Sequence, residues 1–276
     1  MFKIYTKIIL FIFLLNISCT KEIKKENLIN EKDLNSQVLE AFSQGKDALM
    51  QGDVIFAAKK FNEAEVLFPQ SEWAPKASLM AAYAYYSQDY YDEAITELER
   101  YLKIYPSHKN KDYAFYLLAL SYYEQIADEK KDLKSIINAK DNFLYLIKNF
   151  PNTDYAEDSK FKIDLINDIL ASKEMFVGRY YFEKKKWIAA INRFKTVIDA
   201  YDDTIYVEEA LHRLVEIYYI IGVKSEAIKY AKLLGYNYQS SIWYEKSYSY
   251  FNNKYKKNTI NTNQEKSMIE KFKSLF

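Results

Sequence analysis

The sequence predicts an all-α fold: a tetratricopeptide-repeat superhelix, or α-solenoid, of about five helical hairpins. Three observations support this prediction. Hydrophobic residues make up 49% of the 276 residues, enough to bury a core. The chain has only 5 Gly and 4 Pro, whereas a large β-rich fold needs many turn residues. One pattern of small and bulky side chains also recurs five times along the chain.

Residues 1–18 are predicted to be a lipoprotein signal peptide. Lys3 and Lys7 precede an apolar run at residues 8–15, which is too short to cross a bilayer as a helix of ~20 residues. A small residue directly before Cys19 is typical of bacterial lipoprotein processing, although Asn16 stands where Leu is usual. The alternative is an ordinary signal peptide followed by an incidental Cys.

Cys19 is predicted to carry the lipid. It is the only cysteine of the chain, so it has no partner for an intrachain disulfide. Acyl chains contribute ~0.8 kcal/mol per buried CH₂, which makes a stable membrane anchor. Thr20 follows it instead of the Asp that favours inner-membrane retention in lipoproteins, so we expect sorting to the outer membrane. Residues 19–36 are charged and polar and are interpreted as the lipidated Cys with a flexible tether.

The repeats begin at residue 37. Small residues let two helices approach closely, a bulky residue fills the gap between them, and Pro ends the second helix. The first repeat carries Gly45, Ala57, Phe61, Ala64 and Pro69, and positions 37 residues later carry Ala82, Ala94, Leu98, Tyr101 and Pro106. The third repeat, with a charged insertion at about residues 127–135, carries Ala119, Tyr122, Ala139, Phe143, Leu146 and Pro151. Residues 37–152 thus form the predicted N-terminal repeats.

Residues 153–251 are predicted to hold a long helix and two further repeats. No Gly or Pro interrupts the chain between Pro151 and Gly178, so one long helix, or two nearly continuous ones, from about Asp154 to Lys184 is expected to join repeats three and four. Asp154 and Glu157 are interpreted as its capping pair. Repeats four and five carry Gly178, Tyr181, Ala190, Phe194 and Val197, then Val215, Tyr218, Ala227, Ala231 and Leu234.

The tail at residues 252–276 differs from the repeats in composition. It holds six Lys and two Glu, and its first part has little apolar content. Met268, Ile269, Phe272 and Leu275 then recur at helical spacing. The tail is either a frayed, solvated end or a short amphipathic helix that docks on a partner.

No group of residues predicts catalysis or a cofactor. The chain has only two histidines, His108 and His212, and they fall in different repeats. No metal-ligand spacing appears, and five scattered glycines offer no phosphate-binding loop. The net charge of +1 gives no indication of nucleic-acid binding. We therefore expect a binding protein and not an enzyme.

Aromatic residues are the candidates for binding. A helical solenoid presents an extended concave face that suits peptides and partner domains. Five tyrosines of the first half are candidates for a substrate groove, although some of them must belong to the core: Tyr83, Tyr86, Tyr90, Tyr113 and Tyr116. Because the chain has 27 Tyr in total, composition bias is the competing interpretation for any one of them.

Four stretches resemble the BamD family of outer-membrane lipoproteins. They are the runs at residues 106–116 (PSHKNKDYAFY), 150–156 (FPNTDYA), 178–181 (GRYY) and 187–193 (WIAAINR). The first is considerably more specific than the generic repeat. The resemblance extends from about Cys19 to Leu234, and the lipidated N-terminus, the five repeats and the insertion in the third all agree with it.

The resemblance implies a subunit of the outer-membrane β-barrel assembly machinery, anchored on the periplasmic face. C-terminal repeats of the family dock a POTRA domain of BamA, other lipoproteins of the machinery bind as well, and N-terminal repeats receive targeting segments of unfolded outer-membrane proteins. Arg193 matches a basic position in the family and is the candidate BamA contact, with a solvated helix-face Arg as the alternative. Trp187 is a second candidate, with packing as its alternative. Asp202 and Asp203 replace the usual Tyr-Pro-Asp, so the turn after repeat four is expected to differ.

Two other classes share parts of this pattern. A type IV pilus secretin pilotin has the same anchor and repeats, but lacks the run at residues 106–116 and the insertion. A periplasmic adaptor for cell-wall or Tol–Pal work usually has a coiled coil before its repeats, and residues 20–36 show no heptads.

Overall fold

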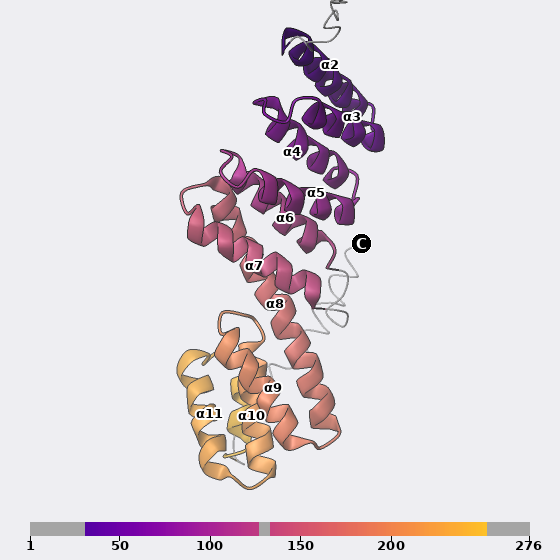
Figure 1. Ribbon diagram of the computed structural model, residues 1–276. Helices are drawn as coiled ribbons and strands as arrows, with labels where there is room; N and C mark the ends of the chain where they lie inside the picture. The colour runs from indigo at the N-terminus through magenta and orange to yellow at the C-terminus, as the bar shows by residue number, and fades with distance from the viewer. Residues whose placement is uncertain (1–30, 127–132, 253–276) are drawn as a thin grey trace, which may run out of the picture. The chain divides into compact units, whose positions relative to one another are not determined.

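The computed structural model describes residues 31–126 and 133–252, and every regular element in these ranges is a helix (Figure 1). The all-α prediction is confirmed. Cys19, residues 127–132 of the charged insertion and residues 253–276 of the tail lie outside the described residues. The helices are α2 (Glu31–Met50), α3 (Val54–Leu67), α4 (Trp73–Tyr86), α5 (Tyr91–Ile104), α6 (Lys111–Glu124), α7 (Lys134–Asn149), α8 (Asp154–Glu183), α9 (Trp187–Ala200), α10 (Val207–Ile220), α11 (Lys224–Asn237) and α12 (Ile242–Ser249).

The chain divides into two compact units, up to Ala77 and from Ser78, and the division falls inside α4. The predicted division between residues 37–152 and 153–251 remains a prediction. In the first unit α2 packs on α3, and Phe42 lies edge-on to both Phe61 and Trp73, with ring centroids 5.2 and 5.1 Å away.

Helix α2 begins at Glu31, inside the segment predicted as tether, because the apolar spacing of this helix already starts at Leu34.

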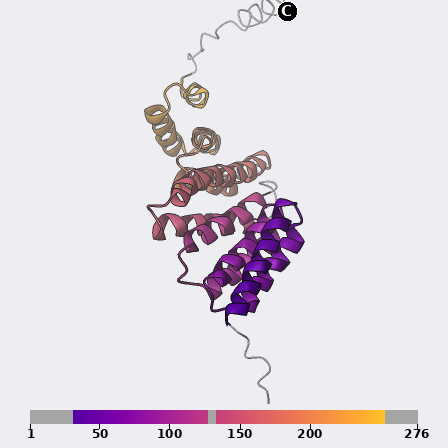
Figure 2. The ribbon, with the colours of Figure 1, turned by 90° about the horizontal axis from the view of Figure 1, so that it is seen from above.

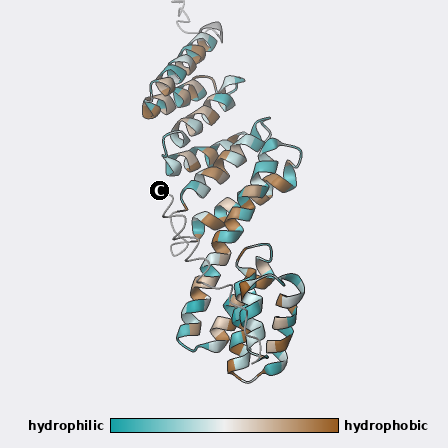
Figure 3. Cartoon of the chain, turned by 180° about the vertical axis from the view of Figure 1, so that it is seen from behind, coloured by the Kyte–Doolittle hydropathy of each residue, from teal (hydrophilic) through white to brown (hydrophobic). Residues whose placement is uncertain are grey.

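In the second unit successive helices pack against their neighbours in chain order from α5 to α11, and α12 packs on α10 and α11 (Figures 1 and 2). Hydrophobic and hydrophilic residues alternate along these helices (Figure 3), as expected when each helix buries one stripe. Among the described residues of this unit, buried side chains cluster on α4–α6, on α6–α8 and on α8–α11.

The predicted pairs of small and bulky residues meet where the two helices of a hairpin touch. A Cβ added to Gly45 would lie 2.8 Å from the ring of Phe61, and one added to Gly178 would lie 2.6 Å from Phe194. The bulky members of four repeats are fully buried: Phe61, Leu98, Phe143 and Phe194. Close helix approach is therefore what the repeat pattern encodes, and the predicted hairpin fold is confirmed.

The turn between the two helices of a repeat has one backbone form in four repeats. Gly52, Asp89, Lys185 and Gly222 all have positive φ, of 82°, 64°, 55° and 83°. In each case the next residue donates its N–H to the carbonyl five positions back, as in a Schellman motif. Asp89 follows Gly52 by 37 residues, and Gly222 follows Lys185 by the same number, which is the offset of the first two repeats.

The second helix of every repeat ends on an aromatic residue. Phe68, Tyr105, Phe150, Tyr201 and Tyr238 are the C-caps of α3, α5, α7, α9 and α11. The cap at Tyr201 (φ −139°, ψ 44°) matches those at Phe150 (−132°, 48°) and Tyr238 (−135°, 53°). The expectation that the turn before Asp202 differs is thus wrong for the cap, because the aromatic residue sets this geometry whether or not Pro follows.

The long helix that joins repeats three and four is confirmed as α8, with 30 residues. Its N-cap is Thr153 and not the predicted pair of Asp154 and Glu157. Thr153 has extended backbone dihedrals, and its hydroxyl oxygen accepts a hydrogen bond from the N–H of Ala156 at 3.2 Å. The two carboxylates instead lie in the first turn, where their negative charge interacts favourably with the positive end of the helix dipole. None of the described helices is both long and apolar enough to cross a membrane.

Candidate functional site

Arg193 of α9 is held at the junction with α8. Its Nη1 donates to both carboxylate oxygens of Glu174, at 3.1 and 3.0 Å. The arginine side chain keeps 44% of its surface exposed, whereas that of Glu174 is only 18% exposed. A pair this exposed contributes ~0–1 kcal/mol to folding. The ion pair thus restricts the orientation of a guanidinium that a partner can still reach.

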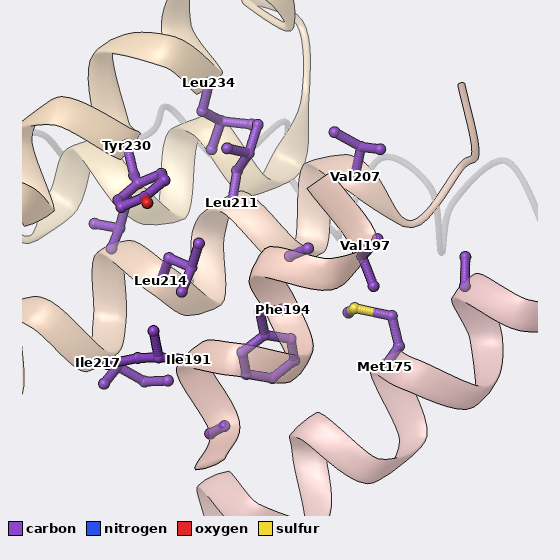
Figure 4. Packing of buried hydrophobic residues seen from close by; sticks show 14 residues of the cluster. Met175, Ile191, Phe194, Val197, Val207, Leu211, Leu214, Ile217, Tyr230 and Leu234 are labelled. Carbon is purple, nitrogen blue, oxygen red and sulfur yellow. The ribbon is translucent and has the colours of Figure 1, made fainter. Parts of the chain in front are cut away.

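The helices behind Arg193 form a packed platform. Met175 of α8, Phe194 of α9 and Leu214 of α10 are fully buried, and Figure 4 shows side chains from α8, α9, α10 and α11 gathered in one cluster. Because such cores resist deformation, the surface groups above them keep fixed relative positions. Repeats four and five are therefore a suitable base for docking a folded domain.

A second charged network links α8 to α10, and sequence reasoning missed it. Arg179 donates from Nε and Nη2 to the two oxygens of Glu209, at 2.9 and 2.6 Å, and Arg213 reaches the same carboxylate at 3.4 Å. Burial raises the pKa of Glu209, but the hydrogen bonds and charges of Arg179 and Arg213 outweigh it and lower the pKa overall. No motif gives this pairing, because the residues are thirty positions apart and meet only in the fold.

Trp187 is partly buried at the start of α9. Its ring lies edge-on to Phe182, with centroids 5.6 Å apart, and packs against the core of α8–α11. Arg193 is six residues further along the same helix, so the two side chains point to different sides. They therefore do not share one face of α9, and a partner contact through Trp187 remains a prediction.

The five candidate tyrosines separate into two groups. Tyr83 and Tyr90 are exposed, at 37% and 43%. Tyr113 and Tyr116 pack on Tyr155 of α8, with ring centroids 5.5 and 5.0 Å away, and the Tyr116 hydroxyl donates to Asp158 at 2.7 Å. Burial raises the pKa of Tyr113 to about 12, in keeping with this packing role.

Tyr86 belongs with the packing group. It is half-buried against the core of α4–α6, and its ring lies 5.8 Å from that of Tyr91. Only Tyr83 and Tyr90 therefore present accessible aromatic rings among the five. A role for any of the five in substrate binding remains a prediction.

The specific run at residues 106–116 has a structural role. The hydroxyl of Tyr101, which is fully buried, lies 2.6 Å from Nδ1 of His108. The N–H of Asn110 points to the same nitrogen at 3.4 Å. His108 thus ties the turn after α5 to the core. Among the residues that the structure describes, no three His, Cys, Asp or Glu side chains gather as a metal site.

An apolar groove on α11 and α12 is a further feature that sequence reasoning missed. Its volume is about 520 Å³, and most of its lining is aromatic or aliphatic. Residues from positions 228 to 251 form it, so only the fold brings its walls together.

Comparison with known proteins identifies the family. The model of the YfiO family, described as an outer membrane lipoprotein, matches residues 35–234. The chain belongs to this family. It is 42% identical to the outer membrane protein assembly factor BamD of Rickettsia prowazekii (strain Madrid E) over 221 residues, which cover 80% of this chain and 87% of that protein. The BamD of Caulobacter vibrioides is 39% identical over 234 residues, 85% of this chain and 76% of the relative. The resemblance to the BamD family is therefore confirmed.

Solved structures give a weaker likeness. The TPR domain of P58(IPK) has a TM-score of 0.42 at 12% identity and covers 79% of this chain and 57% of that chain. The TPR2AB domain of yeast Sti1 has a TM-score of 0.42 at 14% identity, covering 78% and 82%. Pseudomonas aeruginosa pilF has a TM-score of 0.35 at 12% identity, covering 78% and 98%. Likeness at this level says nothing about which partners the YfiO-family chain binds.

Proposed function

We propose that this YfiO-family chain is a lipid-anchored, non-enzymatic scaffold subunit of the outer-membrane β-barrel assembly machinery. The observation that carries the proposal is the similarity, over most of the chain, to proteins named outer membrane protein assembly factor BamD. Cys19 carries the anchor and places the repeats on the periplasmic face of the outer membrane. The predicted signal peptide and the family description as an outer membrane lipoprotein support that location.

Repeats four and five dock the POTRA region of BamA, with Arg193 as the central contact. The half-exposed guanidinium, oriented by Glu174 above a packed core, supports this assignment. A carboxylate on the partner would compete with Glu174 for the N–H donors of the guanidinium. The planar guanidinium matches the two oxygens of a carboxylate well. Other lipoproteins of the machinery bind elsewhere on the scaffold.

The N-terminal repeats receive segments of unfolded outer-membrane proteins. Transmembrane barrel strands alternate apolar and polar residues and carry aromatic residues at the membrane interfaces. The exposed rings of Tyr83 and Tyr90 suit such segments, because tyrosine offers a rigid apolar face with a polar tip. Tyr86, Tyr113 and Tyr116 contribute through helix packing, in the clusters on α4–α6 and α6–α8.

Affinity purification from mild detergent tests the docking proposal. The intact chain should co-elute an outer-membrane barrel protein with POTRA domains, and Arg193→Glu should reduce that recovery at least ten-fold. Lys103→Glu is the matched control, because this exposed lysine of α5 undergoes the same charge reversal outside repeats four and five. Equal recovery with Arg193→Glu, or recovery of a secretin in place of the barrel protein, contradicts the assignment.

Membrane fractionation tests the anchor separately. Cys19→Ala should release the chain from the outer-membrane fraction and abolish incorporation of an acyl label. Cys19→Ala that stays fully membrane-bound would show that the anchor is assigned wrongly, whatever the result for Arg193.

A further inference from the structure

The groove on α11 and α12 has the character of a binding site for an apolar helix face. Its walls include Ile228, Tyr236, Tyr244, Tyr248 and Phe251. Tyr236 is 85% exposed, and Ile228, Tyr248 and Phe251 are each about two-fifths exposed, at 42%, 37% and 38%. Large apolar side chains gathered around one hollow present far more hydrophobic surface to water than single exposed residues do.

Gly235 sets the depth of the groove. A Cβ at this position would lie 2.6 Å from the ring of Tyr244, so only glycine lets that ring lie against the backbone of α11. Among the described residues that line it, Lys232 alone is charged. An occupant is therefore recognised by apolar contact and shape, with little help from charge.

The chain itself supplies a segment of this kind. Phe251 lines the groove, and the described structure ends at Asn252, so the polypeptide leaves at the rim. Residues 253–276 follow, and Met268, Ile269, Phe272 and Leu275 would share one face of a helix. Ser274 would lie on the opposite face.

The intervening residues are long enough to bring this segment back. Residues 253–266 are mostly polar, and a flexible chain of that length spans an r.m.s. distance of ~20 Å, or at most ~50 Å when extended. A tether of this kind gives an effective concentration in the millimolar range, which favours even a weak apolar contact.

We propose that residues 267–276 dock as a short amphipathic helix in the α11–α12 groove of the same chain. Phe272 and Ile269 contact the aromatic walls, and the basic residues of the segment face solvent. Because both the segment and Lys232 are basic, the contact is apolar and is not weakened by salt. A partner that uses this groove must first displace the segment.

Photo-crosslinking of the purified full chain in lipid nanodiscs tests the proposal. A benzophenone amino acid in place of Tyr236 should give an intrachain crosslink to the peptide that contains Phe272. The same probe at Ile205, which is 79% exposed but does not line the groove, should not. Phe272→Asp should lower the crosslink yield at least ten-fold, whereas Ser274→Asp, on the opposite face, should leave it unchanged.

Hydrogen exchange gives an independent readout on the same chains. Amides of residues 228–251 should exchange several-fold faster with Phe272→Asp than with Ser274→Asp, at low and at high salt. A crosslink between two chains would assign the groove to a second copy, and no crosslink at Tyr236, or equal yields from both variants, would also overturn the proposal. No assembly partner is present in these experiments, so their outcome is separate from that of the BamA proposal.

Discussion

Gly178 of α8 lies against Phe194 of α9 so closely that a Cβ at position 178 would be 2.6 Å from the aromatic ring. Alanine stabilises a helix interior by ~1 kcal/mol relative to glycine, so propensity alone favours Gly178→Ala. The buried ring cannot move away without disturbing the core of α8–α11. Overpacking costs ~1–3 kcal/mol, and we expect this cost to exceed the gain in helix propensity.

Urea unfolding of Gly178→Ala should therefore show a net loss of up to roughly 2 kcal/mol in the free energy of unfolding. Gly178→Ala should cost less in a Phe194→Leu background than in the parent chain, because the smaller side chain makes room for the new methyl group. A single variant as stable as the parent chain would show that the helices can separate at little cost.

Lys185 offers the opposite test at the turn between α8 and α9. Its φ of 55° is a left-handed conformation that a residue with a Cβ adopts at a cost, whereas Gly222 fills the equivalent turn without strain. Lys185→Gly should raise the free energy of unfolding by roughly 0.5–1 kcal/mol. Asp89→Gly should gain less, because the Asp89 carboxylate accepts a 2.7 Å hydrogen bond from Tyr91. Chemical denaturation of both variants checks the order.

The pairs of small and bulky residues could be predicted from the sequence, because side-chain size and spacing alone identify them. Gly178 and Phe194 are readable as a small and a bulky residue at a repeat-specific spacing, and the uninterrupted apolar pattern of α8 is equally direct. The left-handed turn at Lys185 was not predictable, since lysine carries no signal for positive φ. The available clue was its position in the repeat, which is equivalent to that of Gly222.

The site was less predictable than the fold. Exposure of a tyrosine depends on which neighbour packs on it, and Tyr155, which packs on Tyr113 and Tyr116, lies at the start of the long helix α8. The groove at Tyr236 likewise needs two helices to meet. Position in the repeat indicates which helix a residue occupies, but contacts between repeats decide whether it packs or binds.

Tyr116 provides a check on that division of the tyrosines. Tyr116→Phe removes a hydroxyl that donates to Asp158 at 2.7 Å and leaves the ring packing on Tyr155 intact. The free energy of unfolding should fall by ~1–2 kcal/mol, because a hydrogen bond to a charged group is lost. Tyr83→Phe should change it by less than ~0.5 kcal/mol, since this side chain is exposed. Equal effects in thermal unfolding would place Tyr116 outside the packing group.

His212 links α10 to α12 and makes the stability of the C-terminal helices depend on pH. Its Nδ1 lies 2.8 Å from the hydroxyl oxygen of Ser247, and its ring centroid is 5.1 Å from that of Trp243. Burial lowers the pKa of His212 to about 4; the nearby carboxylate of Glu216 opposes this, while the charges of Arg213 and Lys246 add to it.

The direction of the pH effect follows from this lowered pKa. An unfolded chain binds a proton at His212 below pH ~6.5, whereas the folded chain resists protonation until about pH 4. The stabilisation is thus complete above pH 6.5 and is lost as the pH falls toward 4, by roughly 2–3 kcal/mol in total. Carboxylates also titrate in this range, so the comparison with His212→Gln isolates the histidine. Urea unfolding at pH 7.5, 5.5 and 4.5 should show a steeper loss for the parent chain than for the variant, and parallel curves would mean that folding does not lower the pKa of His212.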